Sequence, residues 1–251
     1  LDAALWRREW GVGDPAEVRG GLVEPAPEAP AREVLLLQRK AEKPGRGLGK
    51  TTGWIHRAAL AAKAGRFIHT SSLVAYGIHG GTVSEETPPR GLGSSISYVR
   101  SKALAEREVR EGISRGLDAV ILNPAHLIGP HDERNWSRVF RMVARGRLPA
   151  LPGGGGSFCH VRSVARAHVA AVDRGRAGAN YLLGGADSSY VGLARAIARL
   201  MAVPVRSRTL PLPAMRTLAR IDELVAPLLG REPELTIDTV ELLSHNMGSS
   251  G

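Results

Sequence analysis

The 251-residue chain is poor in cysteine, aromatic residues and long apolar runs, and each shortage excludes a class of protein. Its single cysteine, Cys159, cannot form an internal disulfide, which excludes a disulfide scaffold and fits a reducing compartment such as the cytoplasm. No run approaches the roughly 18 apolar residues of a membrane span, and no secretory leader opens the chain, so we expect no membrane partner. Hydrophobic residues make up 43%, as in an ordinary globular protein.

Lysine is also scarce, since 29 of the 34 basic residues are arginine. The formal net charge of +10 points towards nucleic acid as a partner. However, the basic residues are spread along the chain and aromatic residues amount to only 4%. Nucleic-acid-binding proteins usually concentrate positive charge on one face and interleave it with aromatic side chains. We therefore expect no nucleic-acid partner.

Residues 1–50 lack any convincing alternation of strands and helices, because prolines and glycines interrupt them throughout. Residues 11–16 superficially match a Gly-x-Gly-x-x-Ala dinucleotide loop, and residues 45–51 resemble a P-loop. No apolar strand precedes either segment, and Pro44 stands where the P-loop pattern needs its first glycine. We interpret the first segment as a turn and the second as a glycine-rich linker.

From residue 51 onwards, strands alternate with helices, which predicts an α/β fold with a parallel sheet. The expected elements are a helix over 51–64, a strand over 66–72, a helix over 94–116, a strand over 117–123, helices over 136–145 and 161–174, a strand over 180–183, and helices over 188–201 and 212–229. The last helix is amphipathic and is expected to pack on the C-terminal part of the chain. Residues 148–157 are expected to form a loop, and residues 245–251 a frayed tail.

Tyr98 and Lys102 lie one turn apart in the expected helix over 94–116, so their side chains share one face. A tyrosine is a poor base near neutral pH, but a neighbouring ammonium favours its phenolate. The pair can thus transfer protons, although the same spacing is common on exposed helices. Thr70, Ser71 and Ser72 end the preceding strand, at the edge where parallel sheets place their ligands.

Six segments in this order resemble the extended short-chain dehydrogenase/reductases, in their NAD-dependent epimerase/dehydratase group. Within that group the sequence is similar to dihydroflavonol-reductase-like and hopanoid-associated epimerase-like members. The resemblance covers about residues 52–245. Its segments are HTSSLVAYG (69–77), SYVRSKALAE (97–106), ILNPAHLIGP (121–130), SFCHVRSVARAHVAA (157–171), NYLLGG (180–185) and LLGREPELT (228–236).

The resemblance implies a Rossmann-like parallel sheet flanked by helices, with a small, mainly helical C-terminal substrate lobe. It also implies an NAD or NADP cofactor, and hydride transfer to or from a small-molecule hydroxyl or carbonyl substrate. A reductase or dehydrogenase is favoured over a sugar epimerase. In similar proteins, the helix that contains Tyr98 builds a homodimer interface, and that arrangement is open to this chain as well.

Roles carry over residue by residue from the resemblance. Tyr98 is implied as the general acid/base, Lys102 as the group that lowers the Tyr98 pKa and binds the nicotinamide ribose, and Ser72 as the group that orients the reacting oxygen. The implied cofactor contacts are Thr70, Ser71, Tyr98, Lys102, Pro124 and His126. The implied substrate contacts are Tyr76, Asn123, His126 and the 153–158 loop that ends at Phe158.

The sequence departs from the family at its start, because it has no Gly-x-x-Gly-x-x-Gly turn. The 65 residues before the 66–72 strand are too few for three βαβ units of about 30 residues each. We therefore expect incomplete or divergent N-terminal βαβ units, which are truncated, replaced or read in the wrong frame, and Leu1 in place of methionine indicates a chain that is processed, cut or incomplete. The expected domains are an atypical segment over 1–50, a Rossmann-like catalytic core over 51–130, and the remaining core with the substrate-side lobe over 131–251.

Two further expectations concern side chains that resemble reactive groups. The histidines show no H-E-x-x-H or C-x-x-C partners, so no metal site is expected. Cys159 lies among apolar neighbours and is expected to be a buried, inert thiol rather than a nucleophile. Because the glycine-rich turn is missing, the alternative to an enzyme is a degenerate, non-catalytic relative that acts as a binding module or is an incomplete fragment.

Overall fold

The computed structural model describes residues 56–249, apart from residues 58, 62, 133, 134, 149, 206, 207 and 234. The expectations for residues 1–50, including both glycine-rich segments, lie outside the described residues. The helix expected over 51–64 is described only in part, and residues 56, 57 and 59–61 are helical.

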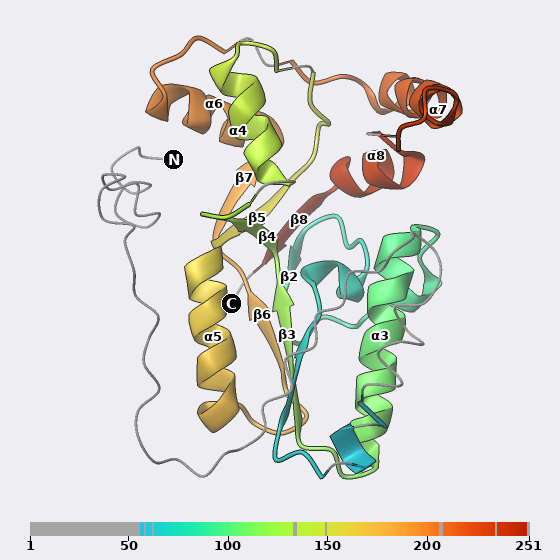
Figure 1. Cartoon of the computed structure of the whole chain (residues 1–251), viewed down its shortest axis with the longest axis vertical. Coiled ribbons are helices and arrows are strands. Elements are labelled where there is room, and N and C mark those ends of the chain that lie inside the picture. The colour runs from blue at the N-terminus through green and yellow to red at the C-terminus, as the bar shows by residue number, and fades with distance from the viewer. Residues whose placement is uncertain are drawn as a thin grey trace.

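A three-stranded parallel sheet with the order β1-β3-β6 forms the centre of the molecule (Figure 1). Its strands are β1 (Phe67–Thr70), β3 (Ala119–Pro124) and β6 (Asn180–Leu183). Helix α3 (Ser97–Ser114) follows β1, and helix α5 (Val161–Arg174) precedes β6. The two helices cover opposite faces of the sheet (Figure 1).

Side chains alternate along β1 and β3, so the sheet has two apolar faces, and each face packs against one of the two helices. On one face, Phe67 and Ile121 pack with Val109 of α3. On the other face, Ile68 and Val120 pack beneath α5. Strand β3 is buried on both faces, which explains why its sequence is a continuous apolar run rather than an alternating one.

A second sheet with the order β2-β8-β5-β4 continues from the carboxyl end of the first. Its strands are β2 (Thr82–Val83), β8 (Asn246–Ser249), β5 (Gly155–His160) and β4 (His126–Ile128), and β7 (Ala186–Ser189) pairs antiparallel with β5. Two short 3-10 helices, η2 (Leu73–Tyr76) and η3 (Gly91–Gly93), follow β1.

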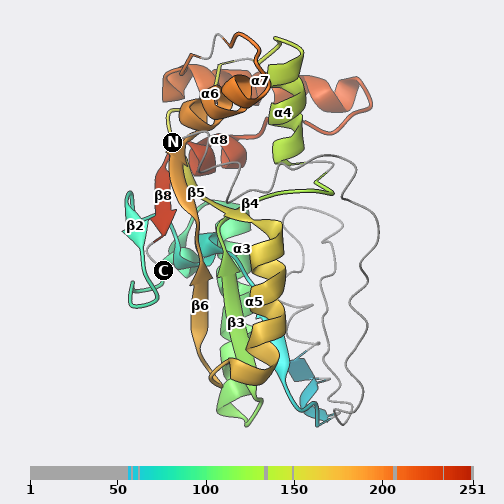
Figure 2. The same cartoon turned by 90° about the vertical axis from the view of Figure 1, so that its left-hand side faces the viewer.

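Four helices gather beyond the carboxyl ends of β3 and β6 (Figure 2). They are α4 (Trp136–Ala144), α6 (Tyr190–Leu200), α7 (Leu212–Leu228) and α8 (Ile237–Leu243). Helices α4 and α6 share a core cluster with β4 and β5. This arrangement confirms the α/β fold and the mainly helical C-terminal part.

Two segments that were expected to be irregular are strands. Residues 155–157, expected in a loop, begin β5, where the absence of a Cβ on Gly155 lets β7 approach: a Cβ there would lie 2.5 Å from the carbonyl oxygen of Ser188. Residues 246–249, expected in a frayed tail, form β8, which pairs with β5 and β2. Both expectations were wrong because glycine- and serine-rich segments carry little strand propensity, and these are ordered by partners far away in the chain.

Helix α7 packs on the C-terminal part of the chain with one face only. Met215 and Ala219 contact α8 through Val240, as expected. On its other side, Leu224 and Leu228 remain 72% and 85% exposed. Among the helices described, none combines the length and the apolarity needed to cross a bilayer.

Burial of β3 generates a stability prediction. Ile121→Ala should lower the free energy of unfolding by about 2–5 kcal/mol, because it leaves a cavity at a fully buried position between the sheet and α3. Leu224→Ala is the matched control, and its effect should stay within about 0.5 kcal/mol because this side chain is 72% exposed. Urea unfolding measures both values. Equal losses in the two variants would contradict this account of the core.

Candidate active site

The carboxyl ends of β1 and β3 bring together serine, asparagine and proline residues that are distant in sequence. The parallel register pairs Thr70 with Leu122, so Ser72 lies beside Asn123 and Pro124. The Ser72 Oγ donates to the Pro124 carbonyl oxygen at 3.5 Å, and the Asn123 Nδ2 donates to the Ser72 carbonyl oxygen at 3.1 Å. Two strand ends are therefore joined at the edge where parallel sheets place ligands.

Tyr98, in the first turn of α3, reaches this edge from the side. A hydrogen bond joins its hydroxyl to Ser72. Burial raises the pKa of Tyr98 above its ordinary value, and the hydrogen bond with Ser72 acts in the opposite direction. The residue as a whole is 44% exposed, so part of its side chain is open to solvent at this edge. Tyr98 is therefore protonated at neutral pH.

Lys102 follows Tyr98 by one helical turn and is half-buried. Burial lowers the pKa of its ammonium, and the negative charge of Glu106 acts in the opposite direction. In turn, burial and the positive charge of Lys102 lower the pKa of His69 on β1 to about 3. His69 is thus a neutral imidazole, and its Nε2 is buried without a hydrogen-bond partner among the described residues.

Glu106, one further turn along α3, is a buried carboxylate that sequence reasoning missed. It is only 6% exposed, and it accepts hydrogen bonds from the Ser71 Oγ at 2.5 Å and from the Asn123 Nδ2. The Asn180 Nδ2 of β6 donates to it at 3.3 Å. The hydroxyl of Ser71, which the resemblance places at the cofactor, is therefore directed into this cluster. The only signal in the sequence is a glutamate four residues after Lys102.

Thr70 is directed to the opposite face of the sheet. Its Oγ1 lies 2.7 Å from the His168 Nε2 of α5, and the His168 Nδ1 lies 2.8 Å from the Val164 carbonyl oxygen. Because a carbonyl only accepts, Nδ1 carries a proton and donates it to the Val164 carbonyl oxygen, which leaves Nε2 to pair with the Thr70 hydroxyl. Thr70 thus fastens α5 to β1, on the other face of the sheet from the α3 residues.

The residues with implied substrate roles are largely buried. Asn123 and Phe158 are both 0% exposed, and Tyr76 is 4% exposed. Burial raises the pKa of Tyr76, and its hydroxyl bonds to Asn180. Since these side chains expose almost no surface to a ligand, their contact with a substrate stays a prediction.

His126 belongs to an aromatic cluster rather than to the Ser72 edge. Its ring stacks on Phe158 with a centroid separation of 5.1 Å, and its Nε2 lies 3.2 Å from the Tyr190 hydroxyl. The ring of Trp136 meets it edge-on at 5.2 Å. Burial lowers the pKa of His126 to about 4, so the imidazole is neutral at physiological pH.

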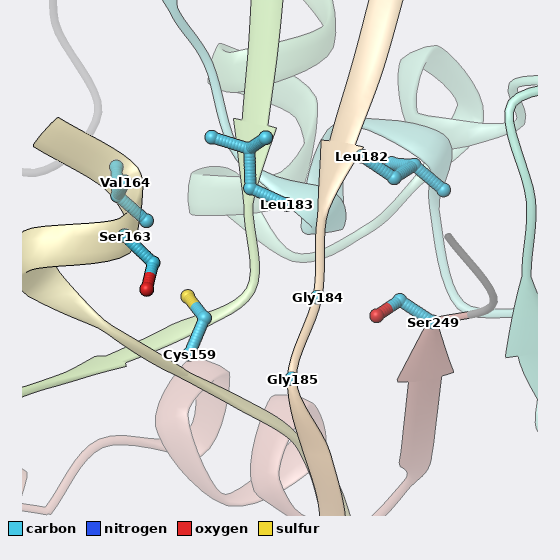
Figure 3. A pocket seen from close by; sticks show the side chains of 8 residues that line it. All are labelled: Cys159, Ser163, Val164, Leu182, Leu183, Gly184, Gly185 and Ser249. Atoms are coloured by element: carbon cyan, nitrogen blue, oxygen red, sulfur yellow. The ribbon is translucent and has the colours of Figure 1, made fainter. Parts of the chain in front are cut away.

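A cavity of about 330 Å³ opens at the carboxyl end of β6 (Figure 3). Its lining residues are Cys159, Ser163, Val164, Leu182, Leu183, Gly184, Gly185 and Ser249. Cys159 is 2% exposed, as expected, and burial raises its pKa to about 11, which keeps the thiol protonated. The lining side chains offer no acid or base that works near neutral pH. Acid–base chemistry is therefore better supported at the Ser72 edge than in this cavity.

Within the part of the chain that the structure describes, no group of three or more histidine, cysteine or acidic side chains is arranged to hold a metal ion.

Comparisons with known proteins identify the family of the chain. Residues 51–184, more than half of the chain, match the model of the NAD dependent epimerase/dehydratase family. A Synechocystis protein named as a candidate dihydroflavonol 4-reductase is 32% identical over 199 residues, which are 75% of this chain and 58% of that protein. The chain thus spans less than two thirds of this relative's length.

Solved structures are similar as well. The crystal structure of gox2253 has a TM-score of 0.68 and 28% identity, and the match covers 85% of this chain and 67% of that one. The enzyme WbmH from Bordetella bronchiseptica, solved in complex with NAD+, has a TM-score of 0.51 and 26% identity over 62% of this chain and 53% of that one. With more than half of its residues matched by the family model, the chain belongs to the NAD-dependent epimerase/dehydratase family.

Proposed function

We propose that the chain acts as an NAD(P)-dependent oxidoreductase on a small molecule that carries a hydroxyl or carbonyl group. Ser72, Tyr98 and Lys102 are its catalytic residues in this proposal. The observation that carries it is the meeting of the Ser72 and Tyr98 hydroxyls beside Pro124, with Lys102 one helical turn away. These groups come from different elements, and Tyr98 follows Ser72 by 26 residues, so helix periodicity alone does not explain their meeting.

The Ser72 edge fits the nicotinamide end of a dinucleotide better than its phosphate end. Lys102 donates no hydrogen bond to any described residue, which leaves its ammonium free for ribose hydroxyls. The described residues before β1 contain no glycine-rich turn that would bind a pyrophosphate. We assign NAD or NADP to this edge through Lys102, Tyr98 and the backbone of Pro124. When bound, the cofactor supplies or accepts the hydride.

Proton transfer falls to Tyr98. In the reduction direction, its phenolic O–H donates a proton to the substrate oxygen, while Ser72 donates a hydrogen bond to the same oxygen. The raised pKa of Tyr98 keeps this proton in place at neutral pH, which is the form that reduction requires. Oxidation requires the phenolate, and the positive charge of Lys102 stabilises that form.

A reductase or dehydrogenase is the preferred reaction within the family. The Synechocystis relative is named as a candidate dihydroflavonol 4-reductase, which reduces a carbonyl to a hydroxyl by name. Epimerization of a sugar would use the same three residues, so the substrate decides between the two.

The homodimer through α3 stays a prediction. The outer face of that helix carries the exposed residues Arg100, Arg107 and Arg110.

The second candidate function is a degenerate relative that binds a small molecule without turnover. It is motivated by the sequence, because the sequence has no Gly-x-x-Gly-x-x-Gly turn and dinucleotide affinity usually depends on such a turn. Quenching of NADH or NADPH fluorescence on titration with the protein separates the two candidates. Binding followed by turnover supports the oxidoreductase, whereas a chain that binds neither nucleotide refutes it.

Tyr98→Phe tests the assignment of the acid/base. We expect kcat to fall by roughly 10²–10⁴-fold, because the phenolic proton is lost while the ring is kept. Nucleotide binding and the thermal unfolding midpoint should match those of the original chain. Oxidation of NADPH and NADH measures kcat with a panel of a dihydroflavonol, a sterol ketone and a UDP-sugar. Tyr181→Phe is the matched control, because its hydroxyl bonds to the backbone N–H of Arg176, away from the Ser72 edge.

The pH dependence of the two directions tests the protonation state of Tyr98. Because its pKa lies above the ordinary value, reduction should be constant through neutral pH and fall only in strongly alkaline solution. Oxidation should rise with pH throughout the same range, since it needs the phenolate. Lys102→Met should move the rise in oxidation to higher pH, because the ammonium no longer stabilises the phenolate. Oxidation that declines with pH would exclude Tyr98 as the base.

A further inference from the structure

We propose that Glu106 is a positioning residue of this site, whose buried carboxylate holds the Ser71–Ser72 turn and Asn123 in place and supplies a negative charge one helical turn from Lys102. The catalytic role of the site rests on the proposed function, whereas the contacts of Glu106 are independent of it. Neither the family model nor the named relatives assign this residue a role.

The hydrogen-bond partners of Glu106 are all donors. Ser71 donates its hydroxyl proton at 2.5 Å, Asn123 donates from Nδ2, and Asn180 donates from Nδ2 at 3.3 Å. The amide oxygens are also used: the Asn123 Oδ1 accepts from Asn180 at 3.4 Å, and the Asn180 Oδ1 accepts from the Arg110 Nη2 at 2.9 Å. An ionised carboxylate suits this environment, because an amide in its place would bring a donor against donors.

These contacts join the elements that carry the candidate catalytic residues. Ser71 lies between β1 and Ser72, and Asn123 lies on β3 and donates to the Ser72 carbonyl oxygen as well as to Glu106. Glu106 itself lies on α3, two turns after Tyr98. One carboxylate therefore fixes the distance between the helix that bears Tyr98 and the turn that bears Ser72.

The charge of Glu106 also acts on Lys102, four residues earlier on the same helix. The other titratable groups around Lys102 are uncharged: His69 of β1 is a neutral imidazole, and Tyr98 is protonated. Burial disfavours the ammonium, and Glu106 is the anion that offsets this cost. Arg110 also approaches the carboxylate, with its Nη2 at 4.0 Å, but its side chain is 49% exposed, so solvent screens this pair.

Glu106→Gln tests both parts of the role, because the amide keeps the size of the side chain and removes its charge. The direct measurement is the titration of the Lys102 ammonium by NMR in protein labelled at the lysine side chains. The chain has only five lysines, so the Lys102 signal is assigned by its loss in Lys102→Arg. We expect Lys102 to lose its proton at lower pH in Glu106→Gln than in the original chain. Glu108→Gln, on the same helix, is the matched control and should leave the titration unchanged.

Turnover gives the second measurement. We expect kcat to fall by roughly 10-fold or more in Glu106→Gln, because Lys102 and Ser72 support the transfer of the proton between Tyr98 and the substrate oxygen. The rise in oxidation with pH should move to higher pH, as it does in Lys102→Met, because Lys102 loses its positive charge earlier in this variant, and loosened packing alone would not produce that change. Glu106→Asp keeps the charge on a shorter side chain. It should retain the Lys102 titration more closely than the glutamine variant, yet lose kcat because it cannot reach Ser71 and Asn123 together.

The outcomes separate this inference from the proposed function. An unchanged Lys102 titration in a folded Glu106→Gln variant overturns the electrostatic part, whether or not the chain turns over. Full kcat in Glu106→Asp overturns the positioning part, even if Glu106→Gln does not fold. If the original chain binds neither NADH nor NADPH, the proposed function fails, and the Lys102 titration still decides whether Glu106 holds its charge.

Discussion

The candidate site depends on the solvation of one buried charge. A carboxylate removed from water is costly unless protein donors replace the lost hydrogen bonds. Glu106 obtains those donors from Ser71 after β1, from Asn123 of β3 and from Asn180 of β6. The residue after β1, the end of β3 and the start of β6 must therefore all lie beside α3 before this helix can bury its glutamate. The location of two candidate catalytic elements follows, because Ser72 is the residue after Ser71, and Tyr98 and Lys102 precede Glu106 on the same helix.

The sheet separates this polar cluster from a second one on its other face. Successive residues of a strand point to opposite faces, and at the end of β1 the side chains of Thr70 and Ser71 diverge accordingly. Thr70 bonds to His168 of α5, whereas Ser71 bonds to Glu106 of α3. Both helices are thus fastened by side-chain hydrogen bonds at the carboxyl edge of the sheet and by apolar packing below it. The Ser72 edge therefore lies between two packed helices and carries the hydroxyl groups of Ser72 and Tyr98, with Lys102 one helical turn after Tyr98.

Local signals were enough for the elements that are regular along the chain. The helix over 161–174 and the strand over 180–183 have the bounds that their composition predicts, and the helix over 94–116 differs only at its ends. Strand β8 escaped prediction because its order comes from β5 and β2 rather than from its own residues. Glu106 escaped for a related reason: a glutamate in a helix is ordinarily solvated, and only the folded chain shows that its partners come from three strands. Cofactor contact by Ser71 remains a prediction, and its hydroxyl already has a partner inside the protein.

The described residues offer candidate contacts to the nicotinamide end of a dinucleotide, but no glycine-rich turn before β1 for its pyrophosphate. The proposed acid–base end is assembled by contacts among residues 66–183, within the segment that the family model matches. Dinucleotide affinity, by contrast, usually draws on backbone N–H groups at a glycine-rich turn and on a helix N-terminus. The described residues before β1 provide no such turn. In the proposed function, the residues for proton transfer and the backbone for dinucleotide binding therefore belong to different segments, so that proton transfer and cofactor affinity can be measured separately. For this reason, the residues at the Ser72 edge indicate the type of reaction, and a measurement of nucleotide binding distinguishes an oxidoreductase from a degenerate relative.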